Sequence, residues 1–185
     1  MNRLIRHRGP DDEGFAFFKA SRQVEIYAGE DTPDDVLSSA IDYAPKIQLD
    51  KSAPAEFKLA FTHRRLSILD LSANGHQPMP SADKRYWLVF NGEIYNHIEL
   101  RMELQELGHK FRTHSDTEVI LAAYAEWGKR SFERLRGMFA FLIYDLHEES
   151  LIAVRDRFGI KPLYYRISES GIAFASEIKQ FTALP

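Results

Sequence analysis

The sequence contains no cysteine among its 185 residues. This absence removes disulfides, thiolate metal ligands and cysteine nucleophiles from any function assigned to these residues. Long apolar runs are also missing, and the basic start from Met1 to Arg8 has no apolar core of signal-peptide length. Neither charge sign dominates, since the net charge is only -3. We therefore expect no nucleic-acid or membrane partner and a cytoplasmic location.

The length and the pattern of apolar residues predict one domain of the α+β class. Strands are expected as a hairpin within residues 14–27, as a strand leading into a packed loop over 57–71, and over 86–90. Helices are expected around Leu100 to Leu107 and from a capping box at Ser115–Glu118 to Gly128. Strands followed by helices and further strands are typical of α+β proteins.

The last third of the chain and one internal segment carry two further predictions. Four short apolar segments follow one another closely and predict an antiparallel meander, over residues 138–144, 151–154, 163–165 and 172–175. Residues 29–56 are rich in Asp, Ser, Pro and Lys, which predicts a surface insertion with one short helix starting near Thr32.

Taken singly, the polar clusters allow purely structural interpretations. Asn91-Gly92 ends an apolar segment and is a turn signal, and Asp116 lies where the helix macrodipole favours a carboxylate. Arg64-Arg65 is equally consistent with solvated charge at a strand end.

The histidines point to no reaction centre. We interpret His63 and His76 as structural, because nothing in their spacing places either near reacting groups. The seven histidines include no pair at helical spacing, so no metal site is predicted.

The order of the polar motifs along the chain is more specific than any single motif. The motifs are RHRGPDDEG, THRRLSILDLS, GHQPM, FNGEIYNH, HSDTEVIL, RGMFAFLIYD, RDRFGIKPLYY and ASEIKQF. In this order they resemble the class II, N-terminal-nucleophile glutamine amidotransferase domain of glutamine-hydrolysing asparagine synthetases. The resemblance covers most of residues 1–185 apart from the insertion at 29–56. It implies a four-layer αββα sandwich of mainly antiparallel sheets that converts glutamine to glutamate and ammonia.

The resemblance also implies roles for five residues. Arg65 matches the family arginine that binds the glutamine α-carboxylate, for which a planar guanidinium is well suited. Glu93 and Asp116 match the acids that face the α-ammonium and the polar groups of glutamine. Asn91 and Gly92 match the oxyanion hole, where loss of one donor typically costs about a hundredfold in rate or more.

The chain departs from the family pattern at its start. Family members begin with a cysteine that opens a core strand, whereas this sequence begins at Met1-Asn2, just before RHRGPDD. We therefore expect the sandwich to be truncated at its N-terminal strand and to lack useful glutaminase activity. Lower stability or self-association is also expected, and homo-oligomerisation stays open.

Two hypotheses about function remain open. In the first, this is the glutaminase domain of an asparagine synthetase, and ammonia passes to a synthetase domain or subunit that is absent here. ATP and magnesium are then expected only in that absent domain, because these residues contain no Gly-rich phosphate loop and call for no cofactor. In the second, the chain is a non-catalytic glutamine-binding, assembly or regulatory module.

Overall fold

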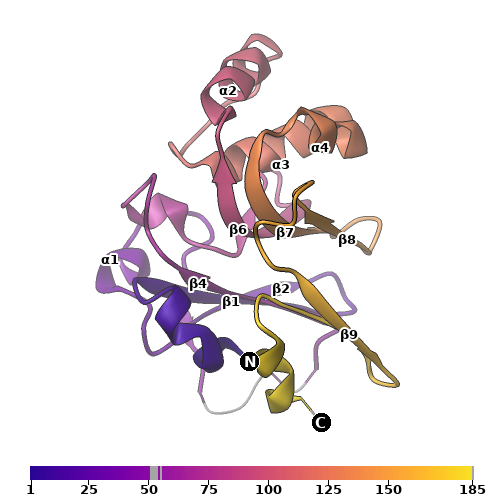
Figure 1. Cartoon of the computed structure of the whole chain (residues 1–185). Helices are drawn as coiled ribbons and strands as arrows, with labels where there is room; N and C mark the ends of the chain where they lie inside the picture. The colour runs from indigo at the N-terminus through magenta and orange to yellow at the C-terminus, as the bar shows by residue number, and fades with distance from the viewer. Residues whose placement is uncertain (51–53, 55, 185) are drawn as a thin grey trace.

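Two four-stranded sheets lie face to face in the computed structural model, which describes residues 1–50, 54 and 56–184 (Figure 1). Helices cover the outer side of one sheet, and short 3-10 helices lie on the side of the other sheet. The α-helical layer contains α2 (His97–Glu106), α3 (Asp116–Trp127), η3 (Gly128–Arg130) and α4 (Ser131–Arg134). The opposite side carries η1 (Asn2–Arg8) and η4 (Ile178–Ala183). The predicted α+β sandwich is confirmed.

The first sheet has the order β3-β2-β1-β4. Its strands are β1 (Asp12–Phe18), β2 (Val24–Ala28), β3 (Ile47–Gln48) and β4 (Leu59–Arg65). The predicted hairpin is formed by β1 and β2, which pair antiparallel, and only the short β3 runs parallel to its neighbour. Every residue of β1 is buried, as expected for a strand that is covered on both faces.

The second sheet has the order β5-β6-β7-β8. Its strands are β5 (Met79–Pro80), β6 (Tyr86–Ile94), β7 (Gly137–Asp145) and β8 (Ser150–Arg155). The two sheets share one core in which the Phe18 ring of the first sheet contacts Trp87 and Tyr144 of the second, with ring centroids 5.5 and 5.0 Å away.

The C-terminal strands correct the predicted meander. β7 and β8 pair as expected, but β9 (Tyr164–Ser168) and β10 (Gly171–Ala175) form a separate two-stranded sheet. The Asp156 carboxylate explains the break, because it accepts backbone N–H hydrogen bonds from Phe158, Ile160 and Lys161. These bonds fold residues 156–161 into a tight turn, and the chain leaves the second sheet there.

Two local predictions also need correction. Residues 29–56 contain the predicted short helix, α1 (Asp34–Leu37), but Val36 and Tyr43 are buried, so the segment is more than a surface insertion. The loop after β4 is not packed, since Leu66 and Leu71 are 56% and 74% exposed. Residues 51–53 and 55, also within 29–56, lie outside the described residues.

The predicted capping box of α3 forms only in part. The Ser115 side chain accepts the backbone N–H of Thr117, as an N-cap residue should. The Glu118 carboxylate turns instead to the preceding loop and accepts the N–H groups of Arg112 and Thr113. Among the helices of the described residues, none has the length and apolarity needed to cross a membrane.

Candidate functional site

The five predicted site residues line one cavity of about 870 Å³. Arg65 enters from the end of β4, whereas Asn91, Gly92 and Glu93 come from the last part of β6. Asp116 is the first residue of α3. The cavity therefore has walls from both sheets and from one helix start, which are far apart in sequence.

Arg65 is buried and is held by the loop that follows β4. Its guanidinium donates hydrogen bonds to the carbonyl oxygens of Asp70 and Ser72, the latter at 2.9 Å. Gly75 lies directly against the guanidinium, and a Cβ on this glycine would overlap the Arg65 side chain. The alternative of solvated charge at a strand end is wrong for Arg65, because the side chain is enclosed.

Arg64 is also enclosed, but it belongs to a different cluster. Its guanidinium lies 2.8 Å from the Glu13 carboxylate and 2.6 Å from that of Asp31, and its side chain is 2% exposed. Adjacent residues of a strand point to opposite faces of the sheet. Arg64 is thus compensated by two carboxylates, which a buried charge requires.

Two contacts of buried side chains hold the loop over residues 66–77 in place beside Arg65. The His76 ring is fully buried, with Nδ1 2.8 Å from Oδ2 of Asp12 on β1. The Tyr43 hydroxyl donates to the carbonyl of Asn74, and burial raises the pKa of Tyr43. These contacts support the interpretation of His76 as structural.

Asp116 lines the cavity from the start of α3. Its Oδ2 accepts the backbone N–H of Ile94 at 2.9 Å, and only 5% of the residue is exposed. Burial raises the pKa of Asp116, and the hydrogen bond from Ile94 works in the other direction. A cation beside this carboxylate would stabilise its charged form, which burial disfavours.

Asn91 and Gly92 do not form the turn that their sequence favours. They continue β6, where Asn91 pairs with Ala140 and Gly92 pairs with Phe139. A Cβ on Gly92 would overlap the carbonyl oxygen of Met138, so close approach of β6 and β7 requires glycine there. Within the described part of the chain, the side chains of Asn91 and Glu93 make no hydrogen bond or ion pair.

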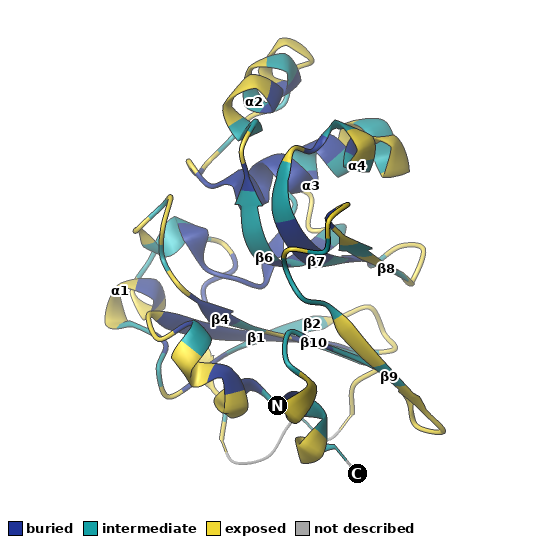
Figure 2. Ribbon diagram, in the orientation of Figure 1, coloured by how far each residue is buried: buried dark blue, intermediate teal, exposed yellow. Residues whose placement is uncertain are grey.

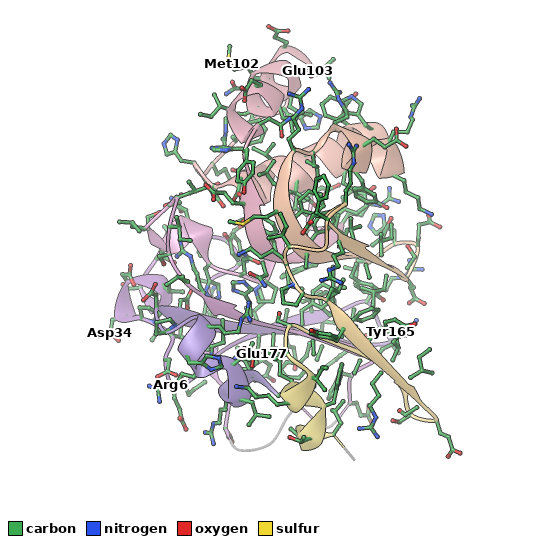
Figure 3. The ribbon with its side chains drawn as sticks, in the orientation of Figure 1. Arg6, Asp34, Met102, Glu103, Tyr165 and Glu177 are labelled. Carbon is green, nitrogen blue, oxygen red and sulfur yellow. The ribbon has the colours of Figure 1, made fainter. Side chains whose placement is uncertain are left out.

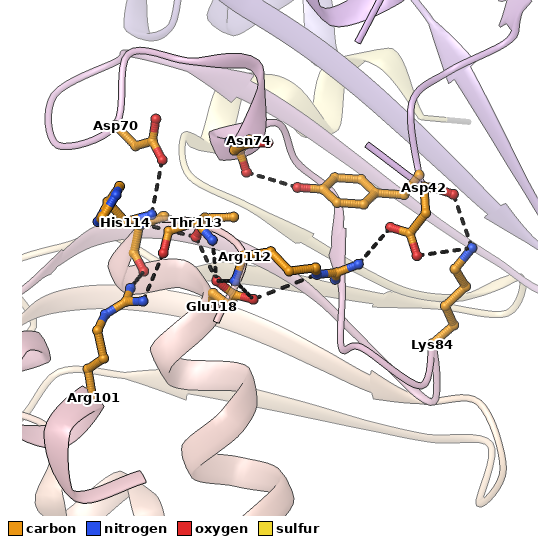
Figure 4. A network of polar contacts seen from close by, with 11 residues as sticks. Asp42, Asp70, Asn74, Lys84, Arg101, Arg112, Thr113, His114 and Glu118 are labelled. Atoms are coloured by element: carbon orange, nitrogen blue, oxygen red, sulfur yellow. Dashed lines mark hydrogen bonds and ion pairs between the residues drawn. The ribbon is translucent and has the colours of Figure 1, made fainter. Parts of the chain in front are cut away.

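A network of polar contacts joins the loop after β4 to the segment before α3 (Figure 4). The Asp70 carboxylate accepts the backbone N–H of His114 at 3.3 Å. The backbone carbonyl oxygen of the same residue accepts a hydrogen bond from the Arg65 guanidinium. Arg101 donates to the carbonyls of Thr113 and Ser115, just before Asp116. Arg65 and Asp116 are therefore positioned by connected segments.

His63 points from β4 toward the second sheet, where its Nε2 lies 3.0 Å from the carbonyl oxygen of Phe90. Burial lowers the pKa of His63 to about 4. The ring is therefore neutral near pH 7 and donates to the carbonyl, which agrees with a structural role.

Sequence reasoning missed Gln77, which also lines the cavity. Its Oε1 accepts the backbone N–H of Phe90 at 2.7 Å, one residue before Asn91. The GHQPM motif points to Gln77, because it places a polar side chain beside a proline. The partner of Gln77, Phe90, is distant in sequence and is not indicated by the motif. The described residues contain no cluster of three or more His, Asp or Glu residues suited to a metal ion.

Comparison with known proteins identifies the class first. A solved glutamine phosphoribosylpyrophosphate amidotransferase from Bacillus subtilis superimposes with a TM-score of 0.73 over 97% of this chain and 38% of that chain. At 23% identity this likeness establishes the fold. The sequence also matches the glutamine amidotransferase domain family over residues 50–185. The chain belongs to this family.

Two curated relatives refine the assignment. Asparagine synthetase [glutamine-hydrolyzing] 1 of Bacillus subtilis (strain 168) is 40% identical over 179 residues, which are 97% of this chain and 22% of the relative. A putative asparagine synthetase [glutamine-hydrolyzing] 1 of Methanocaldococcus jannaschii is 38% identical over 97% of this chain and 29% of the relative. The chain thus spans less than a third of these relatives and corresponds to their amidotransferase domain.

Proposed function

We propose that the cavity binds free glutamine and that this chain is the glutamine-binding part of an asparagine-forming synthetase. The observation that carries the proposal is the convergence of Arg65, Asn91, Gly92, Glu93 and Asp116 on one cavity. Free glutamine is a zwitterion with a neutral side-chain amide. A site for glutamine therefore requires a cation, an anion and hydrogen-bond donors for the side-chain amide, all within a few ångströms of one another.

The charges of the cavity fit the two ends of this zwitterion. Arg65 offers a planar guanidinium for the α-carboxylate, and within the described residues it donates to loop carbonyls and forms no ion pair with a carboxylate. Asp116 offers a buried carboxylate for the α-ammonium. Because both groups are withdrawn from water, each gains more from an opposite charge than an exposed group would.

Other residues of the cavity are available to the side-chain amide of glutamine. The side chain of Asn91, without a partner in the described part of the chain, and the backbone N–H of Gly92 are the donors for a developing oxyanion. Glu93 adds an acceptor for the polar groups of glutamine. These residues explain binding and charge stabilisation, but they include no nucleophile.

These 185 residues contain no cysteine, so they cannot form the thioester that the family mechanism requires. We infer that they bind glutamine and polarise its amide, with hydrolysis limited to what the oxyanion donors provide. This absence also favours a second candidate, a non-catalytic glutamine-binding, assembly or regulatory module. Both candidates use the same cavity.

A synthetase domain or subunit is the proposed partner. The curated relatives are named as glutamine-hydrolysing asparagine synthetases and are several times longer than this chain. We propose that ATP and magnesium act in that other part, and that ammonia is the product handed over.

Titration calorimetry and an assay of glutamate release test the proposal together. We expect glutamine to bind with millimolar affinity or better and glutamate to form at no ordinary enzymatic rate. Glutamate itself is the matched control ligand, since its side-chain carboxylate cannot donate to Glu93. Absence of glutamine binding would refute both candidates. Hydrolysis at an enzymatic rate would show that the inference about the missing nucleophile is wrong.

A further inference from the structure

The Gln77 side chain extends the edge of the second sheet where β5 ends. β5 pairs with β6 over two residues only, and the pair nearest the glutamine corner is Met79 with Leu88. Continuing this antiparallel register by two residues on each strand places Gln77 opposite Phe90. There the side chain takes the place of a strand partner, because its Oε1 accepts the Phe90 N–H at 2.7 Å.

This contact lies beside the donors that the proposed site assigns to glutamine. Backbone N–H groups alternate between the two sides of a strand, so those of Phe90, Gly92 and Ile94 point to the same edge of β6. Gln77 accepts the first, and the Asp116 carboxylate accepts the third at 2.9 Å. No side chain among the described residues accepts the Gly92 N–H. Side-chain acceptors therefore hold the edge on both sides of this donor.

A second contact sets the orientation of the Gln77 amide. Its Nε2 lies 3.5 Å from the hydroxyl oxygen of Thr117, which is a longer and weaker contact than the one to Phe90. Only 6% of Gln77 and 2% of Thr117 are exposed, and Figure 2 shows β6 and the start of α3 in the colours of buried and intermediate residues. The amide nitrogen thus faces α3, which leaves the amide oxygen toward β6.

Loss of the Gln77 acceptor would disturb the neighbouring residues of β6. An unpaired N–H buried at Phe90 is costly, so this part of the strand would move toward another acceptor. Asn91 and Gly92 would move with it, because they are the next two residues of the same strand. A donor that is displaced by about 1 Å leaves the distance range of a good hydrogen bond.

We propose that Gln77 is a positioning residue for the side-chain amide of bound glutamine. It holds the edge of β6 at Phe90, so that the Asn91 side chain and the Gly92 N–H reach the amide oxygen together. The effect passes through Phe90 and not through a contact between Gln77 and glutamine. This role of Gln77 rests on the proposed function, since it presupposes glutamine in the cavity.

Titration calorimetry with L-glutamine and L-norvaline isolates the amide. Norvaline keeps the α-carboxylate and the α-ammonium but has a methyl group in place of the side-chain amide, so the ratio of the two dissociation constants reports the amide alone. We expect wild type to bind glutamine about tenfold or more tighter than norvaline, which corresponds to one or two hydrogen bonds. In Gln77→Met this ratio should fall about fivefold or more, while norvaline affinity changes less than about twofold.

Gln180→Met is the matched control. Gln180 is 5% exposed, and its Oε1 accepts the N–H groups of Ser176 and Glu177 at 3.0 Å each, beside η4 (Figure 3 labels Glu177). The substitution removes the same kind of buried contact as Gln77→Met, but from a segment that has no part in the proposed glutamine site. Its ratio should equal that of wild type.

Two further variants of Gln77 separate positioning from a general loss of stability. Gln77→Glu keeps an oxygen that can accept the Phe90 N–H, and its new charge acts on both ligands alike, so the ratio should stay within about threefold of wild type. Gln77→Asn keeps the amide but is one methylene too short to reach Phe90. It should behave as Gln77→Met does, and it carries the test where Gln77→Met does not fold.

The outcomes distinguish this role of Gln77 from the proposed function. Wild type that does not bind glutamine would refute the proposed function, and the role of Gln77 with it. Glutamine binding by wild type with an unchanged ratio in Gln77→Met or Gln77→Asn would overturn the role of Gln77 alone. So would a wild-type ratio near one, an equal loss of affinity for both ligands, or the same fall in Gln180→Met.

Discussion

The Nδ1 atom of His76 lies 2.8 Å from Oδ2 of Asp12, and both residues are buried. Asp12 is the β1 partner of Arg65, so this contact fixes the end of the loop over residues 66–77 directly beside the guanidinium. The position of Arg65 therefore depends on a contact between residues that are 64 positions apart.

Replacing His76 by alanine should destabilise the fold. The change opens a cavity and leaves the Asp12 carboxylate buried without its partner, which should lower the free energy of unfolding by about 2–4 kcal/mol. Urea denaturation measures this loss. The control is His109→Ala, which removes a partly exposed pair with Glu126 and should cost less than about 1 kcal/mol. Equal losses in the two variants would contradict the anchoring role of His76.

Replacing Arg65 by lysine tests the carboxylate site. Lysine keeps the charge but loses the planar fork, so glutamine affinity should fall about tenfold or more. Calorimetry measures the affinity, and Arg6→Lys is the matched control because Arg6 is an exposed surface residue. Unchanged affinity in Arg65→Lys would remove Arg65 from the glutamine site.

The proposed site could be predicted only in part from the sequence. The motifs pointed to Arg65 and Asp116, and the start of α3 followed from Ser115 as a helix cap. The contacts of Gln77 with Phe90 and of His76 with Asp12 could not be predicted, because they join segments that only the folded sheets bring together.

The same limit applies to the fold. Local apolar patterns predicted the β1–β2 hairpin and β7–β8, where the chain turns back at once. They did not predict that β9 and β10 leave the second sheet, since this depends on Asp156 binding the backbone of its own turn. They also predicted a surface position for residues 29–56, although Tyr43 packs on His76.

Glutamine binding should depend on pH through Asp116. The ammonium of glutamine requires the ionised carboxylate, and burial raises the pKa of Asp116 above its usual value. Affinity should therefore decline as the pH falls toward this raised pKa, sooner than for an exposed carboxylate. Calorimetry between about pH 4 and pH 8 follows this decline, which Asp116→Asn should flatten while it lowers affinity at neutral pH. A wild-type affinity that does not change with pH would argue against Asp116 as the ammonium partner.

Stability should depend on pH through His63. Its pKa falls from 6.5 to about 4 on folding, so between these values the unfolded chain binds more protons. The free energy of unfolding should therefore decrease as the pH falls from 6.5 to 4, by about 1–3 kcal/mol from this residue. Urea denaturation of wild type and His63→Asn compares the two slopes. The slopes should coincide above pH 7 and diverge below it, and parallel slopes throughout would exclude His63 as the cause.

The most direct test of the central claim is a crystal structure of the chain with glutamine. We expect the α-carboxylate within hydrogen-bonding distance of the Arg65 guanidinium, the α-ammonium beside Asp116, and the side-chain amide at Asn91 and Gly92. Glutamine bound elsewhere, or an empty cavity at a saturating glutamine concentration, would contradict the account.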